Sequence, residues 1–535
     1  MKNKRRFLLS ASCIVFASLL FYLSHPNAIF SSGLGFLGYV ALAPVFVFIR
    51  YSRTKTVWLY GALYGLLSYG SFCSWLASFH PLTIYLICFL YAVICSLLFL
   101  VLKLAYSVSL AGLKFFTMAT VWLSYEYIKT LGFLGFSYGI MGYTQWQNPY
   151  MLSLSSLGGV WLPSLACILS SAFLARFFQD LIENKKKLCV RNFIFLFCFC
   201  ASVLLFNGAG FFVRLFNSAS SYQKTVKVIA VQGNVDPWKG GIASYSANVK
   251  SLMSLTDEAL SQSPDAQIVV WPETAFVPPL VYHYNARVDY DRYQLVLSFL
   301  TYLSQKDACF VVGNQHSVDE GKKYTDDYNA ALVFDPKENF LIPPEPEIYT
   351  KQHLVPFTEW FPYEKIFPHL YKALLQGDTH LWSQGKECTV FEKRGLVFST
   401  PICFEDTFGD GCRRFVLNGA KCFVNLSNDA WAASLACQMQ HLSMAVFRSS
   451  ENRVPSVRST ASGMTCLINS DGSLAQCAEP FCKAWISCDI PVEEDMKLTL
   501  YTKVGDWLPL LSILLALLMV SLGAAKPLAR AIKNR

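Results

Sequence analysis

The stretch GLVFSTPICFED, at residues 395–406, decides how the longest hydrophilic part of this chain folds. It starts with an apolar run and ends in a thiol and two carboxylates. Short apolar runs that end in polar residues indicate β-strands. Consecutive Val, Ile and Phe favour strands that are buried on both faces. Runs of the same kind recur around it: TVKVIAVQGN (225–234), AQIVVWPE (266–273), ACFVVGNQ (308–315), NAALVFDP (329–336) and AKCFVNLSND (420–429).

The segments between these strands have the spacing of amphipathic helices. Residues 246–263 and 293–306 carry apolar side chains three and four positions apart, which places them on one face of a helix. Strands and helices that alternate along one continuous stretch indicate a single α/β domain whose central sheets are covered by helices. We expect this domain to occupy residues 220–500.

Three chemically reactive side chains stand at the ends of predicted strands: Glu273, Lys351 and Cys403. A thiol is a strong nucleophile only as the thiolate, so Cys403 needs a proton acceptor, and Glu273 can serve. Attack on an ester or amide carbonyl creates an oxyanion, which the ammonium group of Lys351 can stabilise. Because side chains at strand ends converge on a crevice, the sequence predicts a base, an oxyanion partner and a nucleophile in one pocket.

The rest of the chain is strongly apolar, and the composition as a whole is 53% hydrophobic and only 15% charged. Several runs approach the roughly 20 residues that cross a bilayer as a helix. We therefore expect a membrane domain over residues 1–213 and a C-terminal transmembrane helix. The first span also resembles a signal peptide, but we expect it to be retained because further spans follow. The predicted spans, about eight in all, are 7–24, 34–49, 57–79, 82–102, 115–131, 151–179, 192–213 and 507–524.

Lysine and arginine orient these spans. The chain begins MKNKRR, and basic residues recur on alternate connections and in the C-terminal tail. Basic connections stay in the cytoplasm, so the sequence predicts a multi-pass protein of the bacterial inner membrane with its hydrophilic domain in the periplasm. These residues account for most of the formal net charge of +9. We predict no nucleic-acid partner because no basic aromatic motif accompanies that charge.

The sequence predicts neither a metal nor a cofactor. The 8 histidines are scattered and no CxxC spacing occurs among the 18 cysteines. An oxidising compartment would permit disulfides between the periplasmic cysteines. Two further motifs lack the preceding strand that their usual functions require. The pattern GLGFLG (33–38) matches the dinucleotide-binding motif, but no strand precedes it, and we attribute its glycines to helix packing through small residues. The pattern GFSYG (135–139) matches the serine-hydrolase motif and also lacks a preceding strand.

The strings around the three reactive residues are more specific than the residue types. VVWPETAF contains Glu273, YTKQHLVPFTEWFP contains Lys351 and TPICFED contains Cys403. In this order they resemble the three signatures of the nitrilase superfamily, and QGNV (232–235) and NLSNDAW (425–431) are similar to it as well. The lysine string and the predicted spans together make the whole chain resemble the apolipoprotein N-acyltransferase family.

This resemblance implies a nitrilase-like α-β-β-α sandwich joined to a polytopic helical membrane domain. It implies that Cys403 takes an acyl chain from a phospholipid as a thioester, and that the amine of a diacylglyceryl-cysteine at the start of an apolipoprotein then accepts it. Glu273 would act as general base, and Lys351 would stabilise both tetrahedral intermediates. No cofactor is implied.

The resemblance also implies supporting residues. Glu359 would assist the site, Phe404 and Glu405 would shape the pocket of the nucleophile, and Trp238 would match a tryptophan of the family less well. Two departures stand out. Phe404 replaces the usual tyrosine, and Thr358 replaces the usual glycine, which makes a special backbone conformation at Thr358 less expected.

Two alternatives remain open from the sequence. One is a membrane-anchored amidase or nitrile hydrolase of the same fold, for which so many spans are excessive. The other is a transporter or scaffold with an inactive outer domain, which the intact Glu, Lys and Cys argue against. The apolar segments 276–284 and 360–375 follow the two glutamates. We expect them to act as mobile arms that dip into the membrane interface and admit acyl chains.

Overall fold

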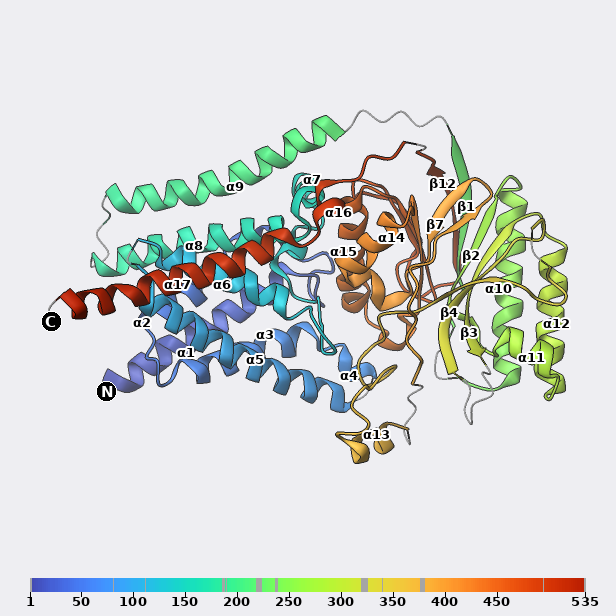
Figure 1. Cartoon of the computed structure of the whole chain (residues 1–535), viewed down its shortest axis with the longest axis horizontal. Helices are drawn as coiled ribbons and strands as arrows, with labels where there is room; N and C mark the ends of the chain where they lie inside the picture. Colours follow the sequence, from blue (N-terminus) through green and yellow to red (C-terminus); the bar gives the residue numbers. More distant parts are fainter. Residues whose placement is uncertain are drawn as a thin grey trace. The chain divides into compact units, whose positions relative to one another are not determined.

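The computed structural model describes residues 2–79, 81–110, 112–184, 188, 190–217, 224–235, 239–318, 326–338, 340–375, 381–493 and 495–533. The chain forms two compact units. The helical unit contains Met1–Ala219, Ser434–Phe447 and Thr499–Arg535, and the sandwich unit contains Ser220–Ala433 and Arg448–Leu498. The last helix, α17 (Trp507–Lys533), packs on α6 (Lys114–Ile128) within the helical unit (Figure 1).

Four helices among the described residues are long and apolar enough to cross a membrane. They lie at Thr83–Val108, Trp161–Glu183, Val190–Asn217 and Trp507–Ala525. They belong to α5 (Pro81–Val108), α8 (Trp161–Glu183), α9 (Val190–Asn217) and α17. These helices make the helical unit a membrane domain by length and composition, and the predicted number of about eight spans stays a prediction. Besides α6, the described part of the unit contains the helices α1 (Lys2–Ser24), α2 (Ala43–Tyr51), α3 (Val57–Phe72), α4 (Leu76–Phe79), α7 (Pro149–Gly158), most of α15 (Leu435–Asn452) and α16 (Leu500–Val504), with the 3₁₀ turns η1 (Gly35–Tyr39) and η2 (Met141–Gln145).

Three predicted spans are not continuous helices. The span expected at 57–79 is divided into α3 and α4. The span expected at 151–179 is divided into α7 and α8, because Gly159 has a φ of 65° and ends α7. The span expected at 34–49 is divided into η1 and α2, and Pro44 stands in the first turn of α2, where its fixed φ suits a helix start. The glycine pattern in η1 is a packing motif, as expected, since a Cβ on Gly35 would lie 2.4 Å from the carbonyl oxygen of Thr144.

Two charged residues lie buried near the end of α6. Glu126 accepts hydrogen bonds from the indole of Trp122, from Ser164 and from the backbone N–H of Met141. The Lys129 ammonium donates to the Tyr69 hydroxyl at 2.8 Å and to the Tyr138 carbonyl at 2.7 Å. This Glu126–Lys129 cluster therefore anchors the chain that leaves α6 and runs into η2.

The sandwich unit is built from two mixed sheets of six strands each. The first has the order β12-β1-β2-β3-β4-β5, in which β1, β2 and β3 are parallel to one another and the pairs β12–β1, β3–β4 and β4–β5 are antiparallel. The second has the order β11-β10-β9-β8-β7-β6, with β7, β8 and β9 parallel. The strands of the first sheet are β1 (Thr225–Gln232), β2 (Ile268–Phe276), β3 (Cys309–Val318), β4 (Asp326–Phe334), β5 (Glu347–Thr350) and β12 (Ala484–Pro491). Those of the second are β6 (Phe391–Lys393), β7 (Leu396–Ser399), β8 (Cys422–Ser427), β9 (Ser456–Thr460), β10 (Cys466–Ile468) and β11 (Leu474–Cys477).

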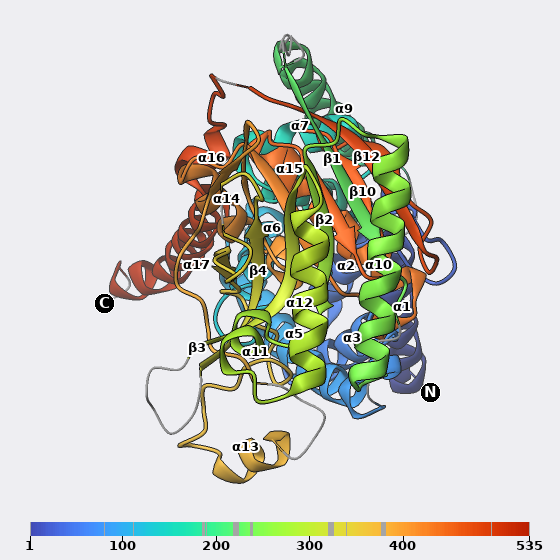
Figure 2. The same cartoon turned by 90° about the vertical axis from the view of Figure 1, so that its right-hand side faces the viewer.

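Apolar side chains cover both faces of the first sheet. Val228 and Val270 pack with Phe398 and Val424 of the second sheet in one core. The alternate residues of the same strands pack under α10 (Ile242–Gln262) and α12 (Tyr290–Ser304), which lie side by side on that sheet (Figure 2). The predicted strands and both predicted helices are thus confirmed. Burial on both faces is the reason that their sequences are continuously apolar.

Candidate active site

Glu273 lies in β2 at a point where the strand leaves its regular pairing with β3. The register shifts between Trp271 and Phe276, and Thr274 has a φ of 52°. Gly313 of β3 makes this irregularity possible, because a Cβ at that position would lie 2.6 Å from the Cα of Glu273. The carboxylate is 6% exposed and accepts a 2.8 Å hydrogen bond from the backbone N–H of Asn428, directly after β8. The kinked strand thus turns Glu273 toward the second sheet.

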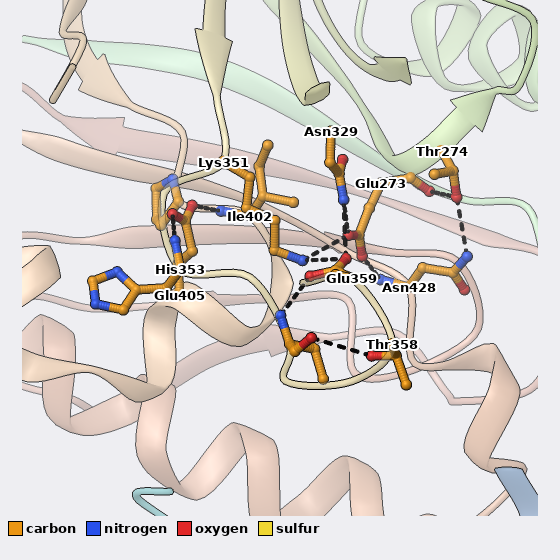
Figure 3. Close-up of polar contacts among 12 residues, drawn as sticks. Glu273, Thr274, Asn329, Lys351, His353, Thr358, Glu359, Ile402, Glu405 and Asn428 are labelled. Carbon is orange, nitrogen blue, oxygen red and sulfur yellow. Dashed lines mark hydrogen bonds and ion pairs between the residues drawn. The ribbon is translucent and has the colours of Figure 1, made fainter. Parts of the chain in front are cut away.

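Lys351 follows β5 and is shared between two carboxylates (Figure 3). Its ammonium group is 2.9 Å from Glu359 Oε1 and 3.2 Å from Glu273 Oε1, and only 1% of its side chain is exposed. The amide nitrogen of Asn329 also donates to both acids, at 2.8 Å to Glu273 and 3.4 Å to Glu359. The backbone N–H of Lys351 in turn donates to the carbonyl of Asn329 at 2.8 Å.

Cys403 opens the 3₁₀ turn η3 (Cys403–Thr407) and has a φ of 49°. A left-handed conformation is uncommon for a residue with a Cβ, and such residues cluster at functional sites. The preceding Ile402 forms a β-bridge with Leu426 of β8, which fixes the start of the turn. The thiol lies within range of the charges of Glu273, Lys351 and Asp429. The structure therefore brings together the three reactive residues that the sequence singled out.

Burial dominates the electrostatics of this site. It raises the pKa of Glu273, and the neighbouring Glu359 adds to the effect while Lys351 and Asn329 oppose it. Burial, with the negative charge of Glu273, also raises the pKa of the Cys403 thiol well above its ordinary value. For Lys351 burial favours the neutral amine, but the two carboxylates outweigh it and hold the pKa well above its usual range. At neutral pH the resting site therefore holds a thiol, a charged ammonium group and a base of raised pKa.

Glu405 has a positioning role that can be read from its contacts. Its carboxylate accepts from the backbone N–H of Ile402 at 2.7 Å, of Gln352 at 2.7 Å and of His353 at 3.1 Å. The Tyr349 hydroxyl lies 2.8 Å from both of its oxygens. Burial raises the pKa of Glu405, whereas these hydrogen bonds favour the anion. Glu405 thus ties the turn of the nucleophile to the segment that carries Lys351.

A second set of buried charges supports the same turn. Asp406 forms an ion pair with Arg458 of β9, and both side chains are almost fully buried. Arg448 donates to the carbonyl of Thr407 at 3.2 Å and pairs with Glu451 at 2.7 Å. Each end of η3 is therefore held by groups on other elements, which over-determines the strained conformation at its start.

The remaining predicted residues have less direct contacts. The ring of Phe404 packs edge-on against the ring of Phe408, with 4.9 Å between the two ring centroids, and so forms an aromatic pair beside the turn. Thr358 donates to the Val355 carbonyl at 3.4 Å, and the left-handed residue of this loop is its neighbour Phe357, with a φ of 64°. Trp238 lies outside the described residues.

Sequence reasoning missed two contributors to the site, since Asn329 bridges both acids from β4 and Tyr349 holds Glu405 from β5. The backbone of Asn428, which lies in the string NLSNDAW, holds Glu273. The one available signal for the missed residues was their position, since Asn329 opens the predicted strand 329–336 and Tyr349 stands two residues before Lys351. No group of three or more His, Cys, Asp or Glu suited to a metal ion occurs in the part of the chain that the structure describes.

The two mixed sheets have the fold of a carbon–nitrogen hydrolase domain, and residues 227–493 match that family. Residues 17–173 match the N-terminal domain of apolipoprotein N-acyltransferase. The chain is 40% identical to apolipoprotein N-acyltransferase 1 of Treponema denticola over 97% of both chains. It is 40% identical to apolipoprotein N-acyltransferase 1 of Treponema pallidum over 89% of both, and 25% identical to the Borreliella burgdorferi enzyme over 92% of this chain and 91% of that one.

The chain belongs to the apolipoprotein N-acyltransferase family. The match extends through both the helical unit and the sandwich, which favours acyl transfer over the alternative of an amidase that acquired a membrane anchor.

Proposed function

We propose that this enzyme transfers a fatty acyl chain from a phospholipid to the N-terminal amine of diacylglyceryl-cysteine in apolipoproteins, through a thioester on Cys403. Membership of the family supports the reaction class. The observation that carries the assignment of residues is the Glu273–Lys351–Glu359 trio, of which Glu273 and Lys351 are buried, beside a thiol on a left-handed turn.

In the first half-reaction, Glu273 takes the proton of Cys403 as the sulfur attacks the ester carbonyl of the phospholipid. A carbon–sulfur bond forms, and the carbonyl oxygen becomes an oxyanion that the Lys351 ammonium stabilises. The carbon–oxygen bond to the glycerol then breaks. Glu273 returns its proton to the leaving oxygen, so that a lysophospholipid departs and the acyl chain stays on Cys403.

In the second half-reaction, the amine of the lipoprotein attacks the thioester carbonyl and loses a proton to Glu273. An amide bond forms, the carbon–sulfur bond breaks, and the proton returns to the sulfur of Cys403. The same base serves both steps because the reaction passes from thiol to thioester and back. A raised pKa suits this exchange, since Glu273 must both accept and return a proton.

The two apolar segments near the glutamates are proposed to admit the lipid substrates. In 276–284, Val277 and Tyr282 are each 37% exposed although Leu280 beside them is fully buried. In 360–375, Ile366 is 67% exposed and Phe367 is 54% exposed. The helix of this segment, α13 (Pro368–Leu375), lies apart from both sheets (Figures 1 and 2). Exposed apolar side chains of this kind suit the boundary between lipid headgroups and acyl chains.

The site is proposed to face the periplasm of a bacterial inner membrane. The argument is the placement of lysine and arginine at the N-terminus, on alternate connections and in the C-terminal tail. A fusion of a periplasm-dependent reporter enzyme after residue 497 would be active under this topology and inactive under the opposite one.

The direct test is the mass of the peptide that contains Cys403. Full-length protein in detergent is incubated with phosphatidylethanolamine, and an acyl adduct is expected on Cys403 that disappears when a diacylated lipopeptide is added. Cys403→Ala should carry no adduct, whereas Cys412→Ala, which removes a buried thiol of the core, should still acylate. An adduct that survives in Cys403→Ala, or release of free fatty acid with no acylated lipopeptide, would refute the assignment.

A further inference from the structure

Two cysteines outside the active site lie directly opposite each other at the edge of the second sheet. Cys466 of β10 and Cys477 of β11 are Cα partners in an antiparallel pair. Strand β11 is the edge strand of this sheet, and its residues are exposed, including Cys477, whereas Cys466 is fully buried. One thiol is therefore open to solvent and the other is held behind it.

The hydrogen bonds of the ladder fix the spacing of this pair. The backbone N–H of Ala478 donates to the carbonyl of Thr465 at 2.8 Å, so the neighbouring pair is a hydrogen-bonded one. Pairs alternate along an antiparallel ladder, and Cys466 and Cys477 accordingly form a non-hydrogen-bonded pair, in which Cα atoms are about 4.5 Å apart. Disulfides span Cα separations of roughly 4.4 to 6.8 Å. The two thiols are thus within bridging distance with no movement of the backbone.

The turn between the strands holds this register. The backbone N–H of Asn469 donates to the carbonyl of Ser473 at 2.8 Å, and that of Gly472 donates to the carbonyl of Asn469 at 2.9 Å. Asp471 accepts from the backbone N–H of Ser473 at 2.9 Å. A slip by one residue would turn Cys477 to the other face of the sheet, and the closed turn opposes such a slip.

We propose that Cys466 and Cys477 form a reversible disulfide that staples the edge hairpin of the sandwich. The oxidant is the disulfide of a small thiol such as glutathione, or of a thiol–disulfide oxidoreductase, in the compartment that the proposed topology gives to this unit. The thiolate of Cys477 attacks that disulfide and displaces one thiol, which leaves a mixed disulfide on Cys477. Cys466 then loses its proton and attacks the sulfur of Cys477, displacing the second thiol. Two cysteine thiols are oxidised and one external disulfide is reduced to two thiols.

The electrostatics favour Cys477 as the attacking group. A hydrogen bond from the Cys466 thiol lowers the pKa of Cys477, while the same interaction, with burial, raises the pKa of Cys466. The more acidic thiol is therefore also the exposed one, which is the arrangement that a first attack on an external disulfide requires.

Two other thiols compete for Cys477 and make the test discriminating. Cys488 of β12 donates to the side chain of Gln476 at 3.5 Å, next to Cys477. Cys482 follows Cys477 on the same chain and is partly exposed. Trypsin leaves Cys466, Cys477 and Cys482 on one peptide, 459–483, because no lysine or arginine stands between Arg458 and Lys483. Cleavage before Asp471 places Cys466 on fragment 459–470 and leaves Cys477 and Cys482 together on fragment 471–483, because Pro480 prevents cleavage after Glu479.

The experiment treats the full-length protein in detergent with glutathione disulfide, blocks remaining thiols with iodoacetamide, and digests with these proteases without reduction. We expect fragment 459–470 linked to fragment 471–483, with Cys482 alkylated and a mass about 2 Da below the sum of the two fragments with Cys466 and Cys477 as thiols, which corresponds to the two hydrogens lost. Cys477→Ser should abolish the link, and Cys482→Ser should leave it intact. The melting temperature should rise on oxidation of the wild type and of Cys482→Ser, and stay constant for Cys477→Ser.

Three outcomes would overturn the proposal: a disulfide within fragment 471–483 between Cys477 and Cys482, a link from this fragment to the peptide of Cys488, or complete alkylation of Cys466 and Cys477 after oxidation. The readout requires no acyl transfer. A failure of the proposed function would leave this result unchanged, and a missing disulfide would leave the thioester on Cys403 to be tested by itself.

Discussion

Each unit contains a Glu–Lys cluster with a buried glutamate and a buried lysine among its described residues, and the difference between the Glu126–Lys129 cluster and the Glu273–Lys351–Glu359 trio separates a structural cluster from a reactive one. In the Glu126–Lys129 cluster each charge has its own partners, which are backbone groups, an indole and hydroxyls. In the Glu273–Lys351–Glu359 trio one ammonium group is shared by two carboxylates. The first cluster is satisfied by groups that hold a loop. The second keeps an excess negative charge next to a thiol, and that excess can take up a proton.

The comparison also shows why buried charge alone does not identify a site. Removing one member of the Glu273–Lys351 ion pair leaves an uncompensated buried charge, which costs roughly 3–5 kcal/mol. Removing Glu126 or Lys129 also destabilises the protein, because it leaves their hydrogen-bond partners unsatisfied. The sandwich differs because the turn at Cys403 and the kink at Thr274 are both left-handed. Strained backbone beside charged groups is typical of functional sites, and the described contacts of Glu126 and Lys129 include no such turn.

The largest contrast is expected for the two glutamates. Glu273→Gln removes the proposed base, and acyl transfer should fall by about 10³-fold, within the range that general base catalysis contributes. Glu126→Gln should keep most of the activity and lower the melting temperature, because the carboxylate of Glu126 accepts three hydrogen bonds that hold α6 and η2 in place. Initial rates with a fluorescent diacylated lipopeptide and thermal unfolding of both variants provide the measurements. Equal losses of activity in the two variants would remove the distinction.

The lysines give a second contrast of somewhat smaller size. Lys351→Met leaves two carboxylates without their cation and removes the oxyanion partner, so the rate should fall by about 10²- to 10³-fold. Lys129→Met should chiefly destabilise the protein, since it removes hydrogen bonds to Tyr69 and to the Tyr138 carbonyl. Thioester formation on Cys403, followed by mass spectrometry in a single turnover, reports the first effect. Wild-type thioester kinetics in Lys351→Met would contradict the proposed role.

The parts of this molecule that the sequence predicted are those with local signals. The runs before Glu273 and Cys403 are apolar at consecutive positions, which is the pattern of strands buried on both faces, and the structure has strands there. The strings around the reactive residues were specific enough to indicate the family. The division of span 151–179 was not predicted, because the break depends on a single left-handed glycine inside a long apolar run.

The supporting contacts were harder to predict because they join elements distant in sequence. Asn329 meets Glu273 across 56 positions, and the backbone of Asn428 meets the same carboxylate across 155. Hydropathy and spacing give no information on such pairs, since an asparagine at a strand end most often serves a turn. The ion pair of Asp406 with Arg458 is similar. Only the strand order of the second sheet, in which β8 lies between β7 and β9, brings β9 near the turn of the nucleophile.

A third prediction concerns the pH dependence of the reaction. Glu273 must be ionised to accept a proton, and its pKa is raised by burial and by the charge of Glu359. The acid limb of kcat/KM should therefore lie at higher pH than for an ordinary glutamate. Glu359→Gln removes one of the charges that raise this pKa, so the limb should move to lower pH while kcat falls about tenfold, an effect of roughly 1.4 kcal/mol. If the acid limb does not move in Glu359→Gln, the limb reports the ionisation of a group other than Glu273.

The smallest effect on the rate is expected for a substitution of Asn329, which also gives the most specific test of the role of Glu273. Its amide hydrogen bond lowers the pKa of Glu273, in opposition to burial. Asn329→Ala should therefore move the acid limb to higher pH, opposite in sign to Glu359→Gln, with a loss of only a few-fold in kcat, because Lys351 and the backbone N–H of Asn428 still bind the carboxylate of Glu273.

Asn314→Ala is the matched control for Asn329→Ala. Asn314 is a buried asparagine of the adjacent strand β3 whose amide donates to the carbonyls of Phe276 and Pro278 rather than to an acid. The Asn314→Ala substitution should lower the melting temperature and leave the acid limb at the pH that it has in the wild type. Shifts of opposite sign for Glu359 and Asn329 would identify Glu273 as the group that titrates, because a general loss of stability moves both variants in the same direction. Shifts of the same sign would mean that the limb belongs to a different residue and that the trio is structural, like the Glu126–Lys129 cluster.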